Sequence, residues 1–441
     1  MPAVKRRSKT ATENSTARAL LNFIDASPSP WHAVAASQVD LQAAGYKLLH
    51  ERETWKLKRG GRYMVVRDDA ALIAFVVGRA TADAGFRIIG AHTDSPGLRV
   101  KTQGASASNG YLRLATEIYG GPILATFTDR DLLLGGRVIV RDASATDGMR
   151  TVLIRLDEAL VRLPNLAIHM NRAVNEDGLK VHKHTGLNLL LATIDDKQDA
   201  PSAWLALLSK AAGVAAADVL GFDLCAVDAQ PGAFFGQHKE FIAVRALDNL
   251  ASCHAATVAM TDTAPAAHTS MIALFDHEEV GSQSRTGAAG TFMQEVMARI
   301  VASSNPETDA MARAVAASWH LSADMAHAFH PAHTDCYDPL HALVVNAGVA
   351  LKINASQRYA TNASGEAFVV ELARKAGVNL QKYVHRADLA CGSTIGPINA
   401  ARLGLRTVDI GTPMWAMHSC RESAGALDQE NYVRLMQRFF A

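Results

Sequence analysis

The chain has 441 residues, of which 49% are hydrophobic and 20% are charged. This composition is typical of a globular protein, and the length exceeds what one hydrophobic core ordinarily holds, so we expect two domains. The formal net charge is +1, with 44 basic and 43 acidic residues, which gives no electrostatic case for binding nucleic acid or an acidic membrane. No apolar run approaches the roughly 20 residues of a membrane helix, so we expect no membrane partner.

The five cysteines are scattered and include no C-x-x-C pair. This pattern favours a reducing compartment, so we expect a cytoplasmic protein without a disulfide framework or a thiolate zinc site. Residues 1–10 carry four basic side chains, but no apolar segment follows them, which excludes a secretory signal. We interpret this basic leader as a solvated, flexible segment; an organelle transit peptide is the alternative.

The first predicted element is a helix, because apolar residues repeat at helical spacing from Ala17 to Ile24 and the run S-P-S-P at 27–30 ends it. Strands are predicted at 72–77 and 86–91. From about residue 98 to residue 237, short β-rich runs alternate with glycine-containing turns. This change of texture predicts an inserted, mainly β second domain over residues 98–237.

After residue 238 the sequence again predicts alternating strands and helices. In chain order, the predicted elements are a strand at 241–245, a helix at 247–260, a strand at 270–275, a helix near 291–302, a strand at 341–346, a helix near 365–375, a strand at 406–410 and a helix near 429–440. Such alternation predicts an α/β fold with a mainly parallel central sheet and helices on both faces. The main domain is therefore expected to be discontinuous, with residues 1–97 and 238–441.

The most informative motif is D-H-E-E-V-G-S at residues 276–282, directly after the apolar run 270–275. In open α/β sheets, ligands gather beyond the carboxyl ends of the strands. Neighbouring side chains in extended backbone point in opposite directions, so Glu278 and Glu279 can divide two tasks. One can bind a metal ion while the other handles a water proton, which is the division that metal-assisted hydrolysis needs.

Other candidate ligands are unremarkable when each is taken alone. His92 and Asp94 follow the predicted strand 86–91; a structural hydrogen-bonding histidine is the plainer interpretation, but a nearby acid also suits a metal ligand whose tautomer must be fixed. Asp248 lies in the first turn of a predicted helix, where an acid also caps the helix or complements its dipole. Asp324 lies in an apolar setting that is costly for an unpaired carboxylate, and His418 follows a Met- and Trp-rich strand end.

Together with Glu279, these residues offer imidazole and carboxylate ligands without sulfur, a set suited to zinc, manganese or cobalt. The glycine-rich run 391–397 lacks the lysine and spacing of a Walker motif, although it can still offer backbone N–H groups to an anion. The chain contains no G-x-G-x-x-G, G-x-S-x-G or H-E-x-x-H motif. Dinucleotide-binding, serine hydrolase and zincin functions therefore lose support.

Seven segments, in this order, resemble the M18 metallopeptidase family, the aspartyl aminopeptidases. They are S-P-S-P-W-H-A at 27–33, H-T-D-S-P at 92–96, L-D-N at 247–249, D-H-E-E-V-G-S at 276–282, Q-R-Y-A at 357–360, C-G-S-T-I-G-P at 391–397 and A-M-H-S at 416–419. The resemblance spans nearly the whole chain and implies a zinc aminopeptidase-like catalytic domain.

The resemblance assigns a dinuclear metal site, with two divalent ions per subunit, most simply zinc, with cobalt or manganese as alternatives. His92 and Asp324 would bind one ion, Glu279 and His418 the other, and Asp248 would bridge them. Two further acids would act beside the ions: Glu278 as the general base toward water, and Asp94 as the residue that orients His92.

The family prefers peptides with an acidic N-terminal residue, Asp or Glu, which requires a cation in the substrate pocket. Lys352 is our candidate, with Tyr359 adding a hydrogen bond; a solvated surface lysine is the alternative. The inserted domain would serve dimerisation, and dimers would build a homododecamer. His169 would reach the partner's active site, contact substrate there and stabilise the oxyanion, unless it is a buried structural histidine.

We therefore expect a cytoplasmic metalloaminopeptidase that hydrolyses acidic residues from peptide N-termini. The rivals are a broader aminopeptidase or deacylase on the same scaffold, and a catalytically silent assembly or metal-binding protein. A complete set of ligands and base disfavours the silent protein.

Overall fold

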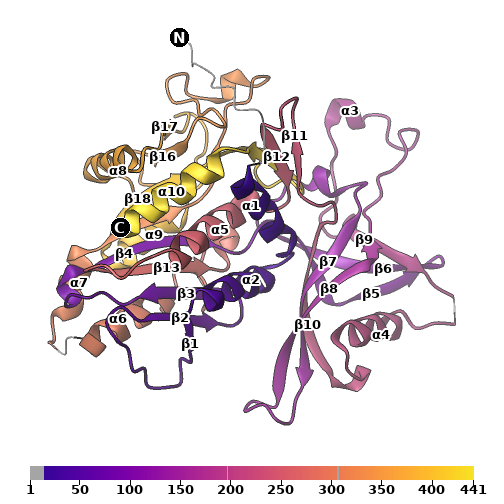
Figure 1. Cartoon of the computed structure of the whole chain (residues 1–441). Coiled ribbons are helices and arrows are strands. Elements are labelled where there is room, and N and C mark those ends of the chain that lie inside the picture. The colour runs from indigo at the N-terminus through magenta and orange to yellow at the C-terminus, as the bar shows by residue number, and fades with distance from the viewer. Residues whose placement is uncertain (1–13, 196, 305–306) are drawn as a thin grey trace.

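The computed structural model describes residues 14–195, 197–304 and 307–441, so the basic leader lies outside the described residues. Two lobes stand side by side (Figure 1): one surrounds a nine-stranded sheet and the other a six-stranded sheet. A five-stranded sheet lies in the first lobe, on the side that faces the second.

The nine-stranded sheet is formed by segments that precede residue 93 and follow residue 268. Its strands are, in spatial order, β1 (Lys47–Leu49), β2 (Arg62–Arg67), β3 (Ala71–Val76), β13 (Thr269–Phe275), β4 (Phe86–His92), β14 (Trp319–Ala323), β18 (Arg406–Gly411), β16 (Val349–Ile353) and β17 (Leu380–Val384). The central pairings β13–β4, β4–β14 and β14–β18 are parallel, as are β1–β2 and β16–β17. The pairings of β3 with β2 and β13, and of β16 with β18, are antiparallel.

Strand β3 explains why both faces of this sheet are covered by helices. Successive strand side chains point to opposite faces, and Leu72 and Ala74 pack into one core while Ile73 and Phe75 pack into the other. The first core is covered by α1 (Ser15–Asp25), α2 (Pro30–Ala43), α5 (Leu247–Thr261), α8 (Ala363–Ala376) and α10 (Asp428–Phe440). The second is covered by α6 (Phe292–Ser304), α7 (Ala310–Ala317) and α9 (Ile395–Leu403). Burial on both faces accounts for the continuous apolar sequence of β3 and β13.

The second lobe has its own hydrophobic core, to which Trp204 and Leu208 of α4 (Ala200–Ala212) contribute. Its antiparallel sheet has the order β8 (Met149–Val161), β7 (Leu132–Arg141), β10 (Val219–Asp228), β5 (Gly97–Ser108), β6 (Tyr111–Tyr119) and β9 (Asn188–Thr193). A single helical turn, α3 (Val174–Asp177), lies in the long connection between β8 and β9. The smaller sheet has the order β11 (Ala233–Phe235), β12 (Phe241–Val244), β20 (Glu422–Gly425), β19 (Pro413–Trp415) and β15 (Ala326–His327).

The predicted α/β class with a mainly parallel central sheet and helices on both faces is confirmed. One strand prediction is wrong. The apolar run 341–346 is irregular, and the strand beside β18 is formed instead by β16, a few residues later. The strand predicted at 241–245 is confirmed as β12, and it belongs to the five-stranded sheet.

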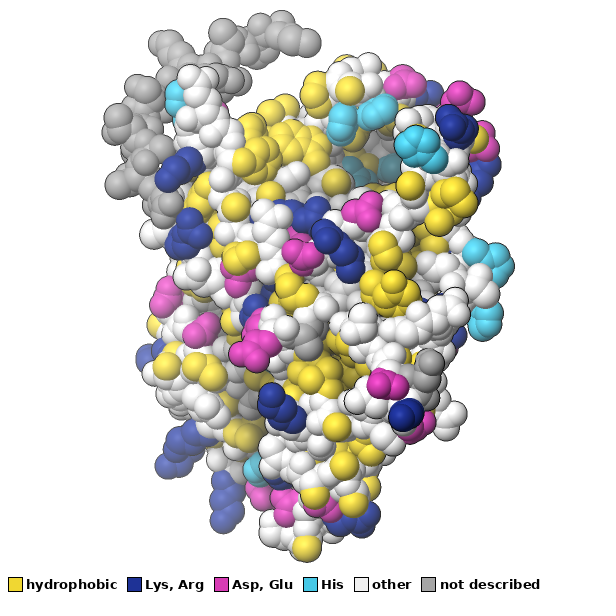
Figure 2. Space-filling view, turned by 90° about the vertical axis from the view of Figure 1, so that its right-hand side faces the viewer, with side chains coloured by type: hydrophobic (Ala, Val, Ile, Leu, Met, Phe, Trp, Pro, Cys, Tyr) yellow, Lys and Arg dark blue, Asp and Glu magenta, His cyan; other side chains and the backbone are white. Residues whose placement is uncertain are grey.

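Among the described residues, no helix combines the length and apolar character needed to cross a membrane. Figure 2 shows acidic and basic side chains interspersed over one face of the molecule, with no large patch of a single sign. This distribution agrees with the near-zero net charge.

Candidate active site

The candidate site lies at the carboxyl ends of three neighbouring parallel strands, β13, β4 and β14. His92 ends β4 and pairs in register with Phe275 of β13, so the loop that carries Glu278 and Glu279 begins beside it. Asp324 directly follows β14 on the other side of β4. The sheet topology therefore brings one imidazole and three carboxylates to a single edge.

Two further residues reach this edge from outside the large sheet. Asp248 is the second residue of α5, where its backbone is not yet helical, and the peptide bond to Asn249 is cis. His418 lies in the loop between β19 and β20, with a positive φ of 68°. The side chain of Asn249 donates to the carbonyl of Ala323 at 2.8 Å, which links the start of α5 to the end of β14.

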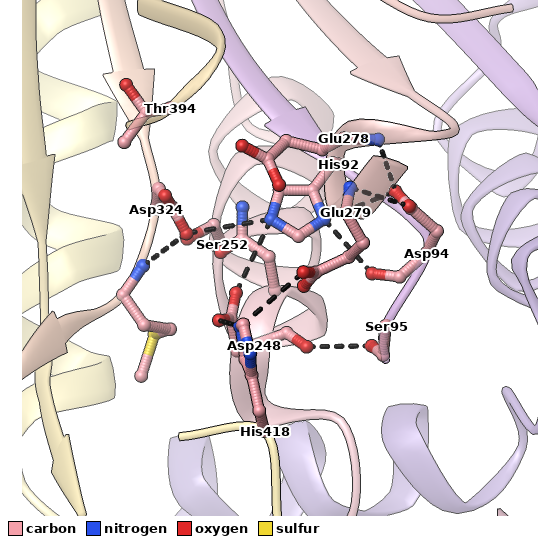
Figure 3. Close-up of polar contacts among 12 residues, drawn as sticks. His92, Asp94, Ser95, Asp248, Ser252, Glu278, Glu279, Asp324, Thr394 and His418 are labelled. Atoms are coloured by element: carbon pink, nitrogen blue, oxygen red, sulfur yellow. Dashed lines mark hydrogen bonds and ion pairs between the residues drawn. The ribbon is translucent and has the colours of Figure 1, made fainter. Parts of the chain in front are cut away.

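The five predicted metal ligands converge (Figure 3). The His92 Nε2 lies 3.4 Å from Asp248 Oδ1 and 3.6 Å from Asp324 Oδ1. The His418 Nε2 lies 3.5 Å from Asp248 Oδ2 and 3.5 Å from Glu279 Oε2. Asp248 thus turns one carboxylate oxygen toward each histidine, and each histidine has one further carboxylate beside it.

The donor atoms of this cluster fit a metal ion. One ligand atom each from His92, Asp248 and Glu279 lie within 4.8 Å of one another. Asp248 Oδ1 is buried and has no hydrogen-bond partner among the described residues, an arrangement that is costly without a cation. An imidazole and carboxylate set without sulfur suits zinc, manganese or cobalt.

Both histidines have the tautomer that a metal ligand needs. A carbonyl oxygen can only accept a hydrogen bond, so the ring nitrogen that faces it must carry the proton. His92 Nδ1 donates to the carbonyl of Asp94 at 3.0 Å, and His418 Nδ1 donates to the carbonyl of Gly121 at 3.1 Å. The Nε2 atom of each ring is therefore free to face the carboxylates.

The shifted pKa values of Glu278, Glu279 and His92 result from the burial of several negative charges close together. Burial raises the pKa of Glu278 to about 7, with His92 opposing the shift and the neighbouring acids adding to it. Burial and the charge of Asp248 raise the pKa of Glu279 well above its usual value. Burial alone would lower the pKa of His92, but its close contacts with the surrounding carboxylates outweigh burial and raise that pKa well above 6.5. A cation placed among these groups would relieve the repulsion.

Asp94 supports the site from behind. Its Oδ1 accepts from the backbone N–H of Glu278 at 3.1 Å, and its Oδ2 accepts from that of Glu279 at 3.1 Å. Its carboxylate also lies 3.3 Å from His92 Nδ1. Burial would raise the pKa of Asp94, but the contact with His92 and the hydrogen bond from Tyr119 lower it, so the group stays ionised. Asp94 thereby positions the loop that carries Glu278 and Glu279, and also the ring of His92.

Sequence reasoning missed Glu422, which has an equivalent structural role on the opposite side. Its Oε2 accepts from the backbone N–H of Asp248 at 3.0 Å, and its Oε1 accepts from that of His418 at 2.7 Å. One buried carboxylate therefore fixes both segments that enter from outside the large sheet. An isolated Glu in a short strand carries no sequence signal for this role.

Lys352 and Tyr359 lie beside the cluster, and the alternative of a solvated surface lysine is wrong. Lys352 is only 2% exposed, and its Nζ lies 2.9 Å from the carbonyl of Met325 and 3.4 Å from Asp324 Oδ2. The same nitrogen lies 5.0 Å from the ring centroid of the buried Tyr359. A buried cation therefore stands next to the carboxylate edge of the site.

His169 is the one predicted site residue that the fold does not bring to this cluster within the chain. It lies in the β8–α3 connection, is exposed, and makes no polar contact with other described residues. The alternative of a buried structural histidine is therefore wrong. Its neighbours Leu166, Ile168 and Met170 are exposed as well, at 69%, 47% and 76%.

The site combines imidazole and carboxylate side chains suited to a metal ion with one further carboxylate, that of Glu278. This combination is typical of a metal-dependent hydrolase. The mainly parallel sheet that carries it is that of a zinc aminopeptidase-like fold. The family described as "Aminopeptidase I zinc metalloprotease (M18)" matches residues 23–440. The chain belongs to this M18 family and is a metalloaminopeptidase.

Relatives and solved structures agree with this assignment. The probable M18 family aminopeptidase 2 of Pseudomonas paraeruginosa is 43% identical over 425 residues, which cover 96% of this chain and 97% of that protein. Its counterpart in Stutzerimonas stutzeri is 44% identical over 427 residues, with the same coverage. The crystal structure of yeast aminopeptidase 1 superposes with a TM-score of 0.85 at 27% identity and covers 97% of each chain. The S. cerevisiae mApe1 dodecamer gives a TM-score of 0.84 at 27% identity, with 98% of this chain and 97% of that chain covered.

Proposed function

We propose that this M18 aminopeptidase removes acidic residues, Asp or Glu, from the N-termini of peptides at a centre that holds two divalent metal ions. The observation that carries the proposal is the position of Asp248, whose two carboxylate oxygens lie 3.4 Å from His92 Nε2 and 3.5 Å from His418 Nε2. A carboxylate shared between two histidines in this way suits a bridge between two cations.

The remaining ligands divide into two groups around this bridge. His92 and Asp324 would hold one ion, and His418 and Glu279 would hold the other, because each histidine has its own second carboxylate within 3.6 Å. Zinc is the ion we propose for both positions, with cobalt or manganese as substitutes. When bound, the ions would polarise the scissile carbonyl, lower the pKa of the attacking water and anchor the α-amine of the substrate.

Glu278 would act as the general base. Its side chain belongs to the same loop as Glu279 but makes none of the close carboxylate–histidine contacts of the five proposed ligands. A base is most effective when its pKa lies near the working pH, and burial raises the pKa of Glu278 to about 7. Glu278 takes a proton from the attacking water and returns it to the leaving amine. Asp94 holds the loop amides of Glu278 and Glu279 and the ring of His92 in place during this transfer.

Preference for acidic substrates would depend on Lys352. The lysine is buried next to Asp324, so a substrate carboxylate that entered here would meet a desolvated cation. Tyr359 lies against the same ammonium group and would add a hydrogen bond. Ionic hydrogen bonds contribute about 1.5–3 kcal/mol, which corresponds to roughly tenfold or more in kcat/KM.

His169 would complete the site of a partner subunit, where it would contact substrate and stabilise the oxyanion. The exposed apolar side chains around it, at Leu166, Ile168 and Met170, are suited to burial against a second copy. The inserted segment 98–237, which forms most of the second lobe, would thus serve dimerisation, while residues 1–97 and 238–441 would form the catalytic domain. The dodecameric assembly of the S. cerevisiae relative supports a dodecamer built from such dimers.

We place the enzyme in the cytoplasm, with peptides as its partners. All five cysteines are free, as expected of a protein from a reducing compartment.

Substrate comparison tests the proposal. Turnover of Asp-, Glu-, Leu- and Lys-terminal peptides, and of an N-acyl amino acid, should give kcat/KM for Asp or Glu about tenfold or more above the others. A preference for Leu would replace the proposal with a broader aminopeptidase, and a preference for the N-acyl substrate would replace it with a deacylase. Absence of turnover in the zinc-loaded protein would favour a silent assembly protein.

A further inference from the structure

One short segment of the second lobe contacts the candidate metal centre at three points. Residues 119–121 end β6 and lead into the turn that follows, far along the chain from every residue of the D-H-E-E motif. Each of the three residues contacts a different member of the site: Asp94, Glu279 or His418.

The first contact is made by a tyrosine hydroxyl. Tyr119 donates from its O–H to Asp94 Oδ2 at 2.7 Å, and Asp94 is fully buried. Hydrogen bonds to a carboxylate are roughly twice as strong as neutral ones. The guanidinium carbon of Arg99, on the neighbouring strand β5, lies 3.8 Å from the centroid of the Tyr119 ring, which holds the phenol in place. Tyr119 thus stabilises the carboxylate that orients His92 and fixes the glutamate loop.

The second contact is a close backbone approach. Gly120 has a φ of +67°, and a Cβ added to it would lie 3.0 Å from the Cβ of Glu279 and 3.3 Å from its carbonyl oxygen. Only glycine fits this position without moving Glu279 or straining the backbone.

The third contact fixes a histidine. The Gly121 carbonyl accepts from His418 Nδ1 at 3.1 Å, and two residues later the N–H of Ile123 donates to the carbonyl of His418 at 2.9 Å. The segment therefore holds both the ring and the backbone of this residue. Partners behind metal ligands of this kind typically change metal affinity by about 10–100-fold when they are lost.

We propose that residues 119–121 form a positioning segment of the metal centre, so that the second lobe completes the centre of its own chain in addition to its proposed role in assembly. This inference rests on the proposed metal site. It assigns to Tyr119 the alignment of Asp94, and to the backbone of Gly120 and Gly121 the placement of Glu279 and His418.

Two pairs of matched substitutions test the segment in the full-length chain. Tyr119→Phe removes only the hydroxyl, and its control is Tyr46→Phe, since the hydroxyl of the buried Tyr46 also donates a hydrogen bond of 2.7 Å, to the carbonyl of Met260. Gly120→Ala adds a methyl group toward Glu279, and its control is Gly110→Ala in the same β5–β6 hairpin. Gly110 has a similar φ of +79° but no heavy atom closer than 4.0 Å to the added carbon.

The measurements are the zinc dissociation constant, by competition with a chromophoric chelator, the Tm of the metal-free protein, and kcat and KM on an Asp-terminal peptide. Tyr119→Phe and Gly120→Ala should weaken zinc binding about 10–100-fold and lower kcat more than they change KM. Tyr46→Phe and Gly110→Ala should lower Tm while zinc affinity stays within twofold of wild type.

Wild-type zinc affinity in both Tyr119→Phe and Gly120→Ala would overturn the inference while leaving the proposed function intact. Equal weakening by the two control variants would also overturn it, because the effect would then follow stability rather than position. A wild-type chain that binds no zinc would instead contradict the proposed function itself.

Discussion

The ammonium group of Lys352 lies 3.4 Å from Asp324 Oδ2, although both residues are buried and lie on different elements of the fold. This ion pair joins the proposed acidic-substrate pocket to a proposed metal ligand. A buried charge is stable only when it is paired and hydrogen-bonded, and Lys352 also donates to the carbonyl of Met325. The cation of the proposed pocket and the carboxylates of the proposed metal centre therefore interact directly.

Lys352→Met should erode the preference for acidic substrates. The kcat/KM for an Asp-terminal peptide should fall about tenfold or more, because an ionic hydrogen bond contributes about 1.5–3 kcal/mol, while turnover of a Leu-terminal peptide changes little. Lys382→Met is the control, since Lys382 lies on the adjacent strand β17 but is exposed and pairs with Glu366. Equal losses on Asp- and Leu-terminal peptides would exclude Lys352 as the determinant of specificity.

Glu278→Gln should separate metal binding from proton transfer. The amide keeps the shape of the side chain but cannot take a proton, so kcat should fall about 10²–10⁴-fold. Metal content, measured by atomic emission, should match that of the wild type. The exposed Glu117 offers a control for loss of one carboxylate elsewhere. Near-normal turnover of Glu278→Gln would assign the base to another residue.

His169→Ala should reduce activity while leaving the metal content unchanged. If His169 acts on a partner subunit, mixing His169→Ala chains with Glu278→Gln chains should restore activity. In a mixed dimer, one site would combine an intact Glu278 with an intact His169 from the other chain. Two mutant proteins that stay inactive after subunit exchange would show that His169 does not act across a dimer. His184→Ala controls for loss of another exposed histidine in the same connection.

His254 should make the fold less stable in acid. It lies on α5, away from the proposed ligands, and its Nδ1 accepts from Gln429 at 3.0 Å. Burial lowers its pKa to about 4, below the unfolded value of about 6.5. The unfolded chain therefore binds the proton more readily, and stability is lost as the pH falls from about 6.5 toward 4.

Between pH 6.5 and pH 5 this contribution amounts to roughly 2 kcal/mol. His254→Asn keeps an acceptor in place of Nδ1 but does not titrate. Urea unfolding of the metal-free protein should show a smaller loss of stability between pH 7 and pH 5 in the variant. The same loss in both proteins would contradict this role of His254.

Sequence pattern predicted the fold best where burial is uniform. The apolar run of β13 and the alternation of helices and strands around it fixed the α/β class, because a strand buried on both faces must be apolar throughout. The prediction failed at 341–346, where an apolar run is also present. There, Asn346 has a left-handed backbone and its N–H donates to Asp428 Oδ2, so a tertiary contact overrides strand propensity.

The candidate site, like the fold, was predictable from the sequence only in part. The ligands follow strand ends or helix starts, and they matched a family pattern, so all five converge as expected. The residues behind them were not found, since Glu422 and Tyr119 act through hydrogen bonds to residues distant in the sequence, which no local motif predicts. The burial of Lys352 was also not predictable from the sequence, because it depends on the pairing of β16 with β18 on one side and β17 on the other.

Counting metal ions tests the central claim most directly. Metal-free protein, prepared by chelation, should be inactive and should bind two zinc ions per chain in a calorimetric titration, with activity restored as the sites fill. Asp248→Asn should lower the affinity of both sites, because its two oxygens face both histidines. Full activity after complete removal of metal, or saturation at fewer than two ions per chain, would contradict the dinuclear centre.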